Sequence, residues 1–243
     1  MIEVILCATL NTDLTPEWFQ LYTKIELLGP DFHVEVMTTK GFLADSARNM
    51  AAWTFLTRTQ ASYLLFIDAD NVLPRNVVPR LLAHNKDVVC GLYMMKDRPF
   101  PPVMYKYHTR PDENGKGFLY KNILQWERGA LFRVDAAGAG CMMISRKCLE
   151  TIPSPWFSFK EGGTEDTYFC RQAQKHGFEV WMDTSVECGH MRTAMVTVDD
   201  YLAQLKNHGV NGLSSMLITM KEAKPWEYMD EKPVEGEFGE VPA

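Results

Sequence analysis

Apolar residues in the first part of the chain form short runs that alternate with segments of helical spacing. The mostly apolar runs at 2–8, 32–39, 63–67 and 87–94 have the length of strands, and such continuous runs are typical of strands buried on both faces. Between them, segments at 17–28, 46–60 and 74–85 predict helices. Strands separated by helices imply right-handed crossovers, and therefore a mostly parallel sheet covered on both faces.

Helix ends are predicted from capping residues. Asp45 or Ser46 is expected to cap the helix that follows it, and Pro74 suits the first turn of the next one. Later in the chain, Thr164 predicts the start of a helix that runs to His176 and is ended by Gly177. The run at 178–183 is then expected to be the last core strand.

The pattern changes after the fourth strand. Segments 101–108 and 118–124 flank a Gly-containing turn and predict an antiparallel hairpin, and 131–150 reads as two strands broken at Gly138 and Gly140, followed by a short helix. We expect one domain over 1–220, with a first half at 1–95 and a second at 96–220. The acidic, Pro- and Gly-rich segment 221–243 is expected to be a flexible tail.

Composition excludes several classes of protein. The 243 residues are 46% hydrophobic and 12% aromatic, which fits a packed core. A net charge of -6 argues against a nucleic-acid grip, although a local basic groove is compatible with it. The six cysteines form no C-x-x-C pair, so buried free thiols in a reducing cytoplasm are expected. The N-terminus lacks a basic leader, and no apolar run approaches the roughly 20 residues of a membrane span.

Two carboxylates end the third apolar run in "LLFIDADNVLP", where Asp68 and Asp70 are separated only by Ala69. Side chains at i and i+2 of a strand point to the same side, here at the carboxyl end of an inner strand, where open α/β sheets bind ligands. Converging carboxylates favour a cation between them, and oxygen ligands suit Mg²⁺ or Mn²⁺. An Asx turn with a helix cap is the structural alternative.

Three classes of site share this carboxylate spacing. An EF-hand loop would need a glycine and a terminal glutamate that "DADNVLPRNVVP" lacks. A haloacid-dehalogenase-like phosphohydrolase, with Asp68 as nucleophile, matches "DADNV" but normally carries the motif on its first strand. The third class is a nucleotide-sugar glycosyltransferase, in which D-x-D holds a metal that bridges the donor pyrophosphate.

Further segments favour the third class. Arg48 and Asn49 lie on the helix before the D-x-D strand, "GAGCMMISRKCLE" follows the hairpin, and "GGTEDTYFCRQAQKHGFEVWMDTSVECGH" ends the pattern. In this order, the segments resemble GT-A glycosyltransferases, particularly the bacterial and phage branch related to glycosyltransferase family two. The resemblance covers residues 2–190. It implies a Rossmann-like α/β GT-A fold with a mostly parallel sheet, helices on both faces and a small antiparallel hairpin on the acceptor side.

The resemblance also implies site roles. Asp166 would be the general base and Glu165 its neighbour, although acidic residues are favoured at helix N-termini without any such role. Arg48 would reach the nucleotide unless it is a solvated helix charge, and Gly140 would approach the donor sugar unless it marks a bulge. The implied metal ligands are Asp68, Asp70 and His190, and the implied donor contacts are Thr9, Asn11, Thr39, Arg48, Asp68 and Gly140.

The aromatic residues just before the acidic pair have two readings. Trp156, Phe157 and Phe159 could stack on an acceptor sugar as a platform, or they could pack across their loop. The segment 98–107 resembles a second flap, and no role is assigned to its tyrosines.

The expected activity is transfer of a sugar from a nucleotide-sugar donor to an acceptor hydroxyl. The resemblance implies UDP as the nucleotide, Mn²⁺ or Mg²⁺ as cofactor, and inversion at the anomeric carbon. The acceptor stays open among a glycan, a small molecule and a modified nucleobase, and nucleic acid enters only as acceptor. The phosphohydrolase and a non-catalytic nucleotide-sugar-binding module remain as alternatives.

Overall fold

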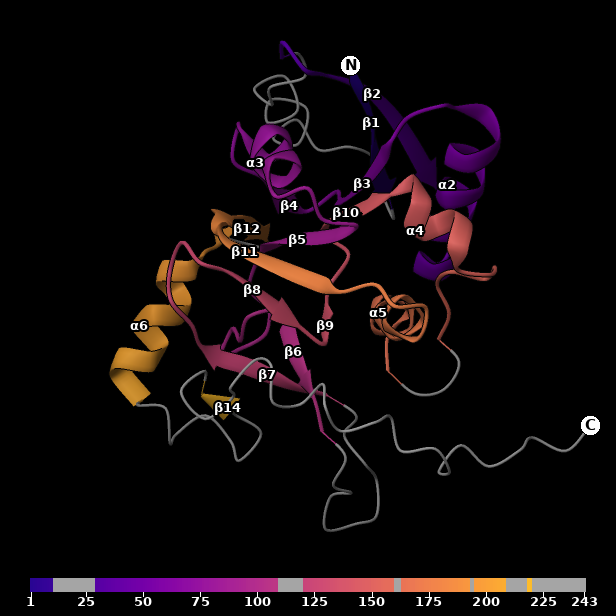
Figure 1. The fold of residues 1–243 in the computed structure, drawn as a ribbon. Helices are drawn as coiled ribbons and strands as arrows, with labels where there is room; N and C mark the ends of the chain where they lie inside the picture. The colour runs from indigo at the N-terminus through magenta and orange to yellow at the C-terminus, as the bar shows by residue number, and fades with distance from the viewer. Residues whose placement is uncertain (11–28, 109–119, 160–162, 193–194, 209–217, 220–243) are drawn as a thin grey trace, which may run out of the picture.

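The computed structural model describes residues 1–10, 29–108, 120–159, 163–192, 195–208 and 218–219. A seven-stranded sheet forms the centre of the molecule, in the order β2-β1-β3-β10-β5-β11-β8 (Figure 1). Its strands are β1 (Ile2–Leu10), β2 (Phe32–Lys40), β3 (Tyr63–Asp68), β5 (Val88–Leu92), β8 (Leu131–Val134), β10 (Cys141–Ser145) and β11 (Val180–Glu187).

Five of the seven strands of this sheet, β2, β1, β3, β5 and β11, run in the same direction. β1 pairs in parallel with β2 and β3, and β5 pairs in parallel with β11. β10 is antiparallel to both β3 and β5, and β8 is antiparallel to β11. The predicted mostly parallel sheet is confirmed, with a reversed strand at its centre that the sequence pattern did not indicate.

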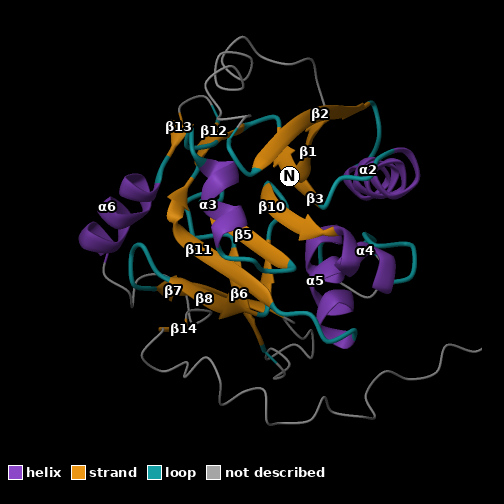
Figure 2. Cartoon of the chain, turned by 45° about the horizontal axis from the view of Figure 1, so that its top comes forward, coloured by secondary structure: helices purple, strands orange, loops and turns teal. Residues whose placement is uncertain are grey.

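Two apolar clusters cover the opposite faces of the sheet. Alternate residues of β3 enter different clusters: Leu64 and Phe66 belong to one, Leu65 and Ile67 to the other. The helices α2 (Ala44–Arg58), α4 (Arg146–Thr151) and α5 (Glu165–Lys175) lie together on one side, and α3 (Val77–Ala83) lies on the other (Figure 2). Because both faces are covered, the inner strands β3, β5 and β10 are almost entirely apolar. The six cysteines are free and buried, as expected.

Two small sheets flank the central one. The predicted hairpin is present as β6 (Met104–Tyr107) and β7 (Tyr120–Gln125), which pair antiparallel within the order β14-β7-β6-β9. A second small sheet has the order β13-β12-β4 and brings residues after β11 next to those after β3. The remaining elements are β4 (Asn71–Val72), β9 (Ala136–Ala137), β12 (Gly189–Met191), β13 (Met195–Val196), α6 (Val198–His208) and β14 (Ile218–Thr219).

Helix ends differ from their predictions in two of three cases. The α2 helix begins before the expected caps, with Leu43 at the N-cap position, and Asp45 accepts a hydrogen bond from the Ser46 N–H in the first turn. Pro74 precedes α3 by a turn, and its carbonyl accepts from the Val77 N–H instead. The third prediction is confirmed, since α5 has Thr164 at its N-cap and Gly177 follows its end at φ 84°.

Several predicted features lie outside the described residues: the helix at 17–28, the hairpin turn and the tail at 221–243. In the part of the chain that the structure covers, none of the helices combines the length and the apolar character of a membrane span.

Candidate active site

The D-x-D motif lies where three parallel strands end together. Across β2, β1 and β3, Thr39 is in register with Thr9, and Thr9 with Asp68. Parallel strands end at the same edge of a sheet, so three of the predicted donor contacts, Thr39, Thr9 and Asp68, lie side by side on neighbouring strands at that edge. Thr39 is buried, whereas Asn11 lies outside the described residues.

Arg48 joins the two acidic motifs. Its guanidinium is buried, with Nη2 2.8 Å from Asp68 Oδ1 and Nη1 3.7 Å from Glu165 Oε1. The interpretation of Arg48 as a solvated helix charge is therefore wrong, because only 4% of the residue is exposed. Desolvation lowers the pKa of Arg48, but the facing carboxylates of Asp68 and Glu165 raise it above its ordinary value, so the side chain stays charged.

The acidic pair opens α5 beside this arginine. Glu165 is buried, while Asp166 keeps part of its surface and accepts hydrogen bonds from the Thr164 hydroxyl and, at 2.8 Å, from the Thr167 N–H. Burial raises the pKa of both carboxyls; for Glu165 the charge of Asp166 raises it further, and Arg48 lowers it in part. Glu165 thus pairs with a buried cation in addition to lying at the helix N-terminus, whereas the hydrogen bonds of Asp166 are local to the first turn of α5.

Asp70, the second carboxylate of the motif, has two partners from distant segments. His190 in β12 places Nε2 3.4 Å from Asp70 Oδ1, and the Lys96 ammonium contacts Asp70 Oδ2. Burial raises the pKa of Asp70, but hydrogen bonds to His190 and Lys96 outweigh it and bring the pKa to about 2. Asp70 therefore carries a full negative charge at neutral pH.

The predicted metal ligands are brought together in part. His190 Nδ1 lies 2.7 Å from the Met94 carbonyl and would donate to it when a cation takes the place of the proton between Nε2 and Asp70. Nε2 would then be a ligand, in the arrangement that ligating histidines usually have. A carboxylate oxygen and an imidazole nitrogen suit Mn²⁺. Asp68 instead pairs with Arg48, and within the described residues no three His, Cys, Asp or Glu side chains are arranged as a metal cluster.

Comparisons with known proteins bear on the fold. No family model and no curated protein match the sequence. Among solved structures, A197 from STIV superposes with a TM-score of 0.54 at 21% identity, over 79% of this chain and 86% of that one. GalNAc-T7, crystallised with UDP, GalNAc and Mn²⁺, superposes with a TM-score of 0.50 at 12% identity, over 84% of this chain. The chain spans 47% of that GalNAc-T7 chain.

The chain has the GT-A fold of glycosyltransferases. At these identities the likeness concerns the fold alone.

Three residues of this candidate site were not predicted. Tyr93 places its hydroxyl 3.2 Å from the Gly140 N–H, which donates to it, and Lys96 contacts Asp70. Asn71 follows the D-x-D motif directly and is fully buried, yet neither atom of its amide has a hydrogen-bond partner within the described part of the chain. A buried amide left without partners costs free energy, so Asn71 is suited to bind a water or a ligand hydroxyl. Its position directly after the D-x-D motif was the one feature of the sequence that could have indicated a role for Asn71 in the site.

Gly140 lies directly against the D-x-D strand. Its carbonyl accepts from the Asp68 N–H at 3.2 Å, and a Cβ on Gly140 would come within 2.1 Å of Asn71 Nδ2 and 3.0 Å of Asp68 Oδ2. The glycine allows this close approach, whereas the alternative of a bulge finds no support in the pairing of β10 with β3, which is regular from Cys141 to Ser145.

We expect Gly140→Ala to displace Asn71 or Asp68 and to lower the free energy of unfolding by about 1–3 kcal/mol, the usual cost of overpacking. Urea unfolding measures this change. Nucleotide affinity, measured by calorimetry, should fall more than tenfold if Asn71 or Asp68 contacts the donor. An unchanged unfolding midpoint would contradict the close packing at Gly140.

The aromatic loop before α5 is mostly part of the core. Asn49 holds it, since its Oδ1 accepts from the N–H groups of Trp156 and Phe157 at 2.9 and 3.1 Å. Trp156 and Phe157 are buried, and the Phe157 ring stacks on Phe169 at 4.9 Å. The acceptor-platform interpretation is therefore wrong for these two residues. Only Phe159, which is 49% exposed, remains available for it among the three.

Proposed function

We propose that the protein is a glycosyltransferase that moves a sugar from a nucleotide-sugar donor to an acceptor hydroxyl, with inversion at the anomeric carbon. The observation that carries this proposal is the contact of one buried arginine with both acidic motifs. Through Arg48, the D-x-D strand and the start of α5 meet at a single site. A donor held by the first motif would then lie beside a base on the second.

In this proposal Asp166 removes the proton from the acceptor hydroxyl as its oxygen attacks the anomeric carbon. Its raised pKa makes its carboxylate a better base than an ordinary aspartate. The ion pair with Arg48 holds the Glu165 carboxylate next to Asp166. The half at 1–95 supplies the donor site through the strand ends at Thr9, Thr39 and Asp68, and the half at 96–220 supplies the base.

Asp70 and His190 are the residues that would hold Mn²⁺ or Mg²⁺. The ion would neutralise the charge that develops on the leaving diphosphate. UDP is the proposed nucleotide, in keeping with its presence in the GalNAc-T7 structure of the same fold. A glycan, a small molecule or a modified nucleobase is the proposed acceptor class.

The test is a thermal-unfolding panel of nucleotide sugars with and without Mn²⁺. A ligand at 100 times its dissociation constant stabilises the folded state by about 2.7 kcal/mol. For a domain of this size, that raises the melting temperature by about 5–10 °C. We expect a UDP-sugar to give this shift and Mn²⁺ to increase it. If no nucleotide sugar moved the transition, the proposal would be withdrawn.

The same samples separate the alternatives. A phosphohydrolase that uses Asp68 would be stabilised by beryllium fluoride, which binds the aspartate carboxylate as a mimic of the aspartyl phosphate. A non-catalytic module would bind the donor in a metal-dependent way without hydrolysing it or transferring the sugar. Mn²⁺-dependent hydrolysis of the donor, measured as release of the nucleotide, supports the transferase.

A further inference from the structure

Lys96 forms an ion pair with Asp70, the carboxylate that would bind a divalent cation in the proposed function. Its ammonium contacts Asp70 Oδ2, while His190 Nε2 faces Oδ1 of the same carboxylate. The pair faces solvent, since 36% of the Lys96 side chain and 43% of the Asp70 side chain are exposed. An ion arriving at Asp70 and His190 therefore meets a cation already in place.

The backbone around Lys96 is fixed to the strand that carries His190. The Arg192 guanidinium donates to the Lys96 carbonyl at 2.9 Å, and His190 Nδ1 lies at hydrogen-bonding distance from the Met94 carbonyl. The Met191 N–H donates to the Asp70 carbonyl at 2.7 Å, so the D-x-D motif is held to the same strand. With its backbone held in this way, a change of partner by Lys96 would require only rotation of its flexible side chain.

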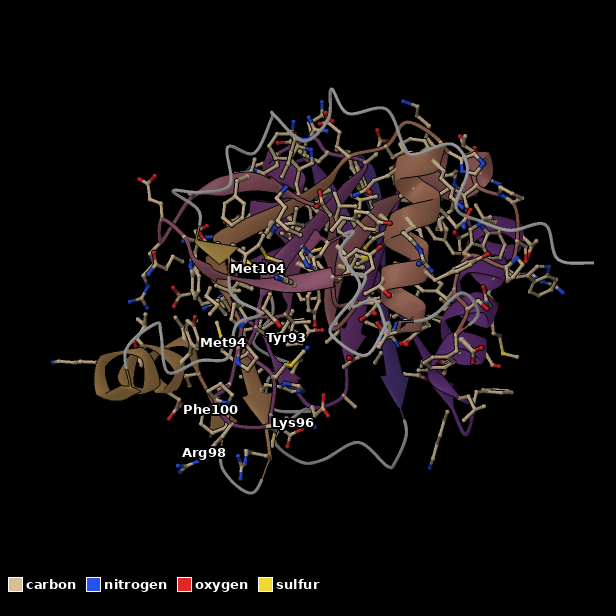
Figure 3. The ribbon with its side chains drawn as sticks, turned by 90° about the horizontal axis from the view of Figure 1, so that it is seen from below. Tyr93, Met94, Lys96, Arg98, Phe100 and Met104 are labelled. Atoms are coloured by element: carbon tan, nitrogen blue, oxygen red, sulfur yellow. The ribbon has the colours of Figure 1, made fainter. Side chains whose placement is uncertain are left out.

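Figure 3 shows Lys96 on the segment that runs from Tyr93 and Met94 at the inner end to Arg98 at the outer edge of the molecule. Within this segment Lys96 contacts the D-x-D motif, whereas the Arg98 guanidinium lies 5.9 Å from the centre of the Phe100 ring. The two cations are two positions apart in sequence but have different neighbours. Arg98 therefore offers a matched control for the charge of Lys96.

We infer that Lys96 is a built-in counter-ion of Asp70 that competes with the divalent cation and, once displaced, binds the diphosphate of the donor. The ammonium and a divalent cation repel each other, so a metal ion on Asp70 drives Lys96 away from that carboxylate. A diphosphate arriving with the metal is the neighbouring anion, and lysine binds phosphate as a point charge. The diphosphate part of this inference rests on the proposed function, while the competition for Asp70 does not.

The experiment compares the wild type with Lys96→Met and the control Arg98→Met by calorimetric titration of Mn²⁺ alone. Removing a partly exposed competitor should tighten Mn²⁺ binding by about three- to fivefold. Arg98→Met, which removes the same charge without the contact, should change the affinity less than twofold. Lys96→Gln serves as a second variant, and thermal melts of all three variants should match that of the wild type.

A second titration uses UDP at saturating Mn²⁺. Lys96→Met should weaken UDP binding by about tenfold, the effect of losing one charge-assisted contact. Mn²⁺ affinity that stays within twofold of wild type, that shifts equally in both methionine variants, or that is undetectable in all of them would overturn the competition. Tighter Mn²⁺ binding by Lys96→Met together with an unchanged UDP affinity would overturn the role of Lys96 in binding the diphosphate. If UDP fails to bind the wild type, the proposed function fails, and the Mn²⁺ titration still decides the competition.

Discussion

Asp166→Asn should lower the turnover of sugar transfer by about 10³-fold, within the 10²–10⁴-fold range that a positioned general base contributes. The amide has the shape of the carboxylate but cannot take the proton of the acceptor hydroxyl. Its oxygen can still accept from the Thr167 N–H, so the start of α5 should remain intact. Donor affinity, measured by calorimetry, should stay within about twofold of wild type. Steady-state rates with a saturating donor measure the loss.

The pH dependence of this variant distinguishes a base from a structural residue. Because the folded-state pKa of Asp166 is raised, its acidic form is favoured by folding, and the stability it contributes below the unfolded pKa of about 3.9 is lost as the pH rises through the folded value. Asp166→Asn should therefore unfold at neutral pH with a free energy at least equal to that of wild type. The acidic limb of kcat/KM should lie above the ordinary aspartate range in wild type and disappear in the variant.

Glu165→Gln is the matched control, because it alters the neighbouring carboxyl on the same helical turn. Its loss of turnover should be smaller, since Glu165 faces Arg48 and takes no proton in the proposed reaction. A collapse of donor binding in Asp166→Asn, or equal losses in the two variants, would contradict the role of Asp166 as base.

The sheet edge that carries Asp68 was predictable because its signals are local. An apolar run ending in a charge indicates a buried strand and its carboxyl end, and parallel strands necessarily end at one edge. The direction of β10 was not predictable, because a strand buried on both faces reads as apolar whichever way it runs. The predicted N-cap of α2 was wrong, because the helix starts at Ala44, before both Asp45 and Ser46.

Contacts between distant segments account for the rest of the site. Asp70 and Lys96 are 26 positions apart, and a lysine after a strand resembles any surface lysine until the fold brings it to a carboxylate. Arg48 stands between Ala47 and the polar Asn49 on α2, so helical spacing alone did not indicate that its guanidinium is buried. The family resemblance proposed Asp70 with His190, and the fold brings them within 3.4 Å of each other.

Arg48→Met should be the most destabilising of the substitutions considered. The variant keeps an apolar side chain of similar length but removes the guanidinium, whose carbon lies 5.9 Å from the centre of the Phe66 ring. Asp68 and the buried Glu165 therefore lose this cation. Removing one partner of a buried ion pair costs about 3–5 kcal/mol, and the 30% exposure of the Asp68 side chain places the expected loss near the lower value, about 3 kcal/mol. For a domain of this size, the melting temperature should fall by about 6–12 °C.

Arg58→Met is the control, because Arg58 lies in the last turn of the same helix and is exposed. It should change the unfolding free energy by less than about 0.5 kcal/mol. In Arg48→Met, Glu165 and Asp166 lose the cation that lowers their pKa, so the folded pKa values of these two residues rise and their protonated forms become more favoured by folding. The loss of unfolding free energy in Arg48→Met, relative to wild type, should therefore be largest at neutral pH and become smaller towards pH 4. Adding Glu165→Gln should restore part of the stability at pH 7, since it removes one unpaired charge. If Arg48→Met and Arg58→Met melted alike at pH 7, Arg48 would not be the residue that holds the two acidic motifs together.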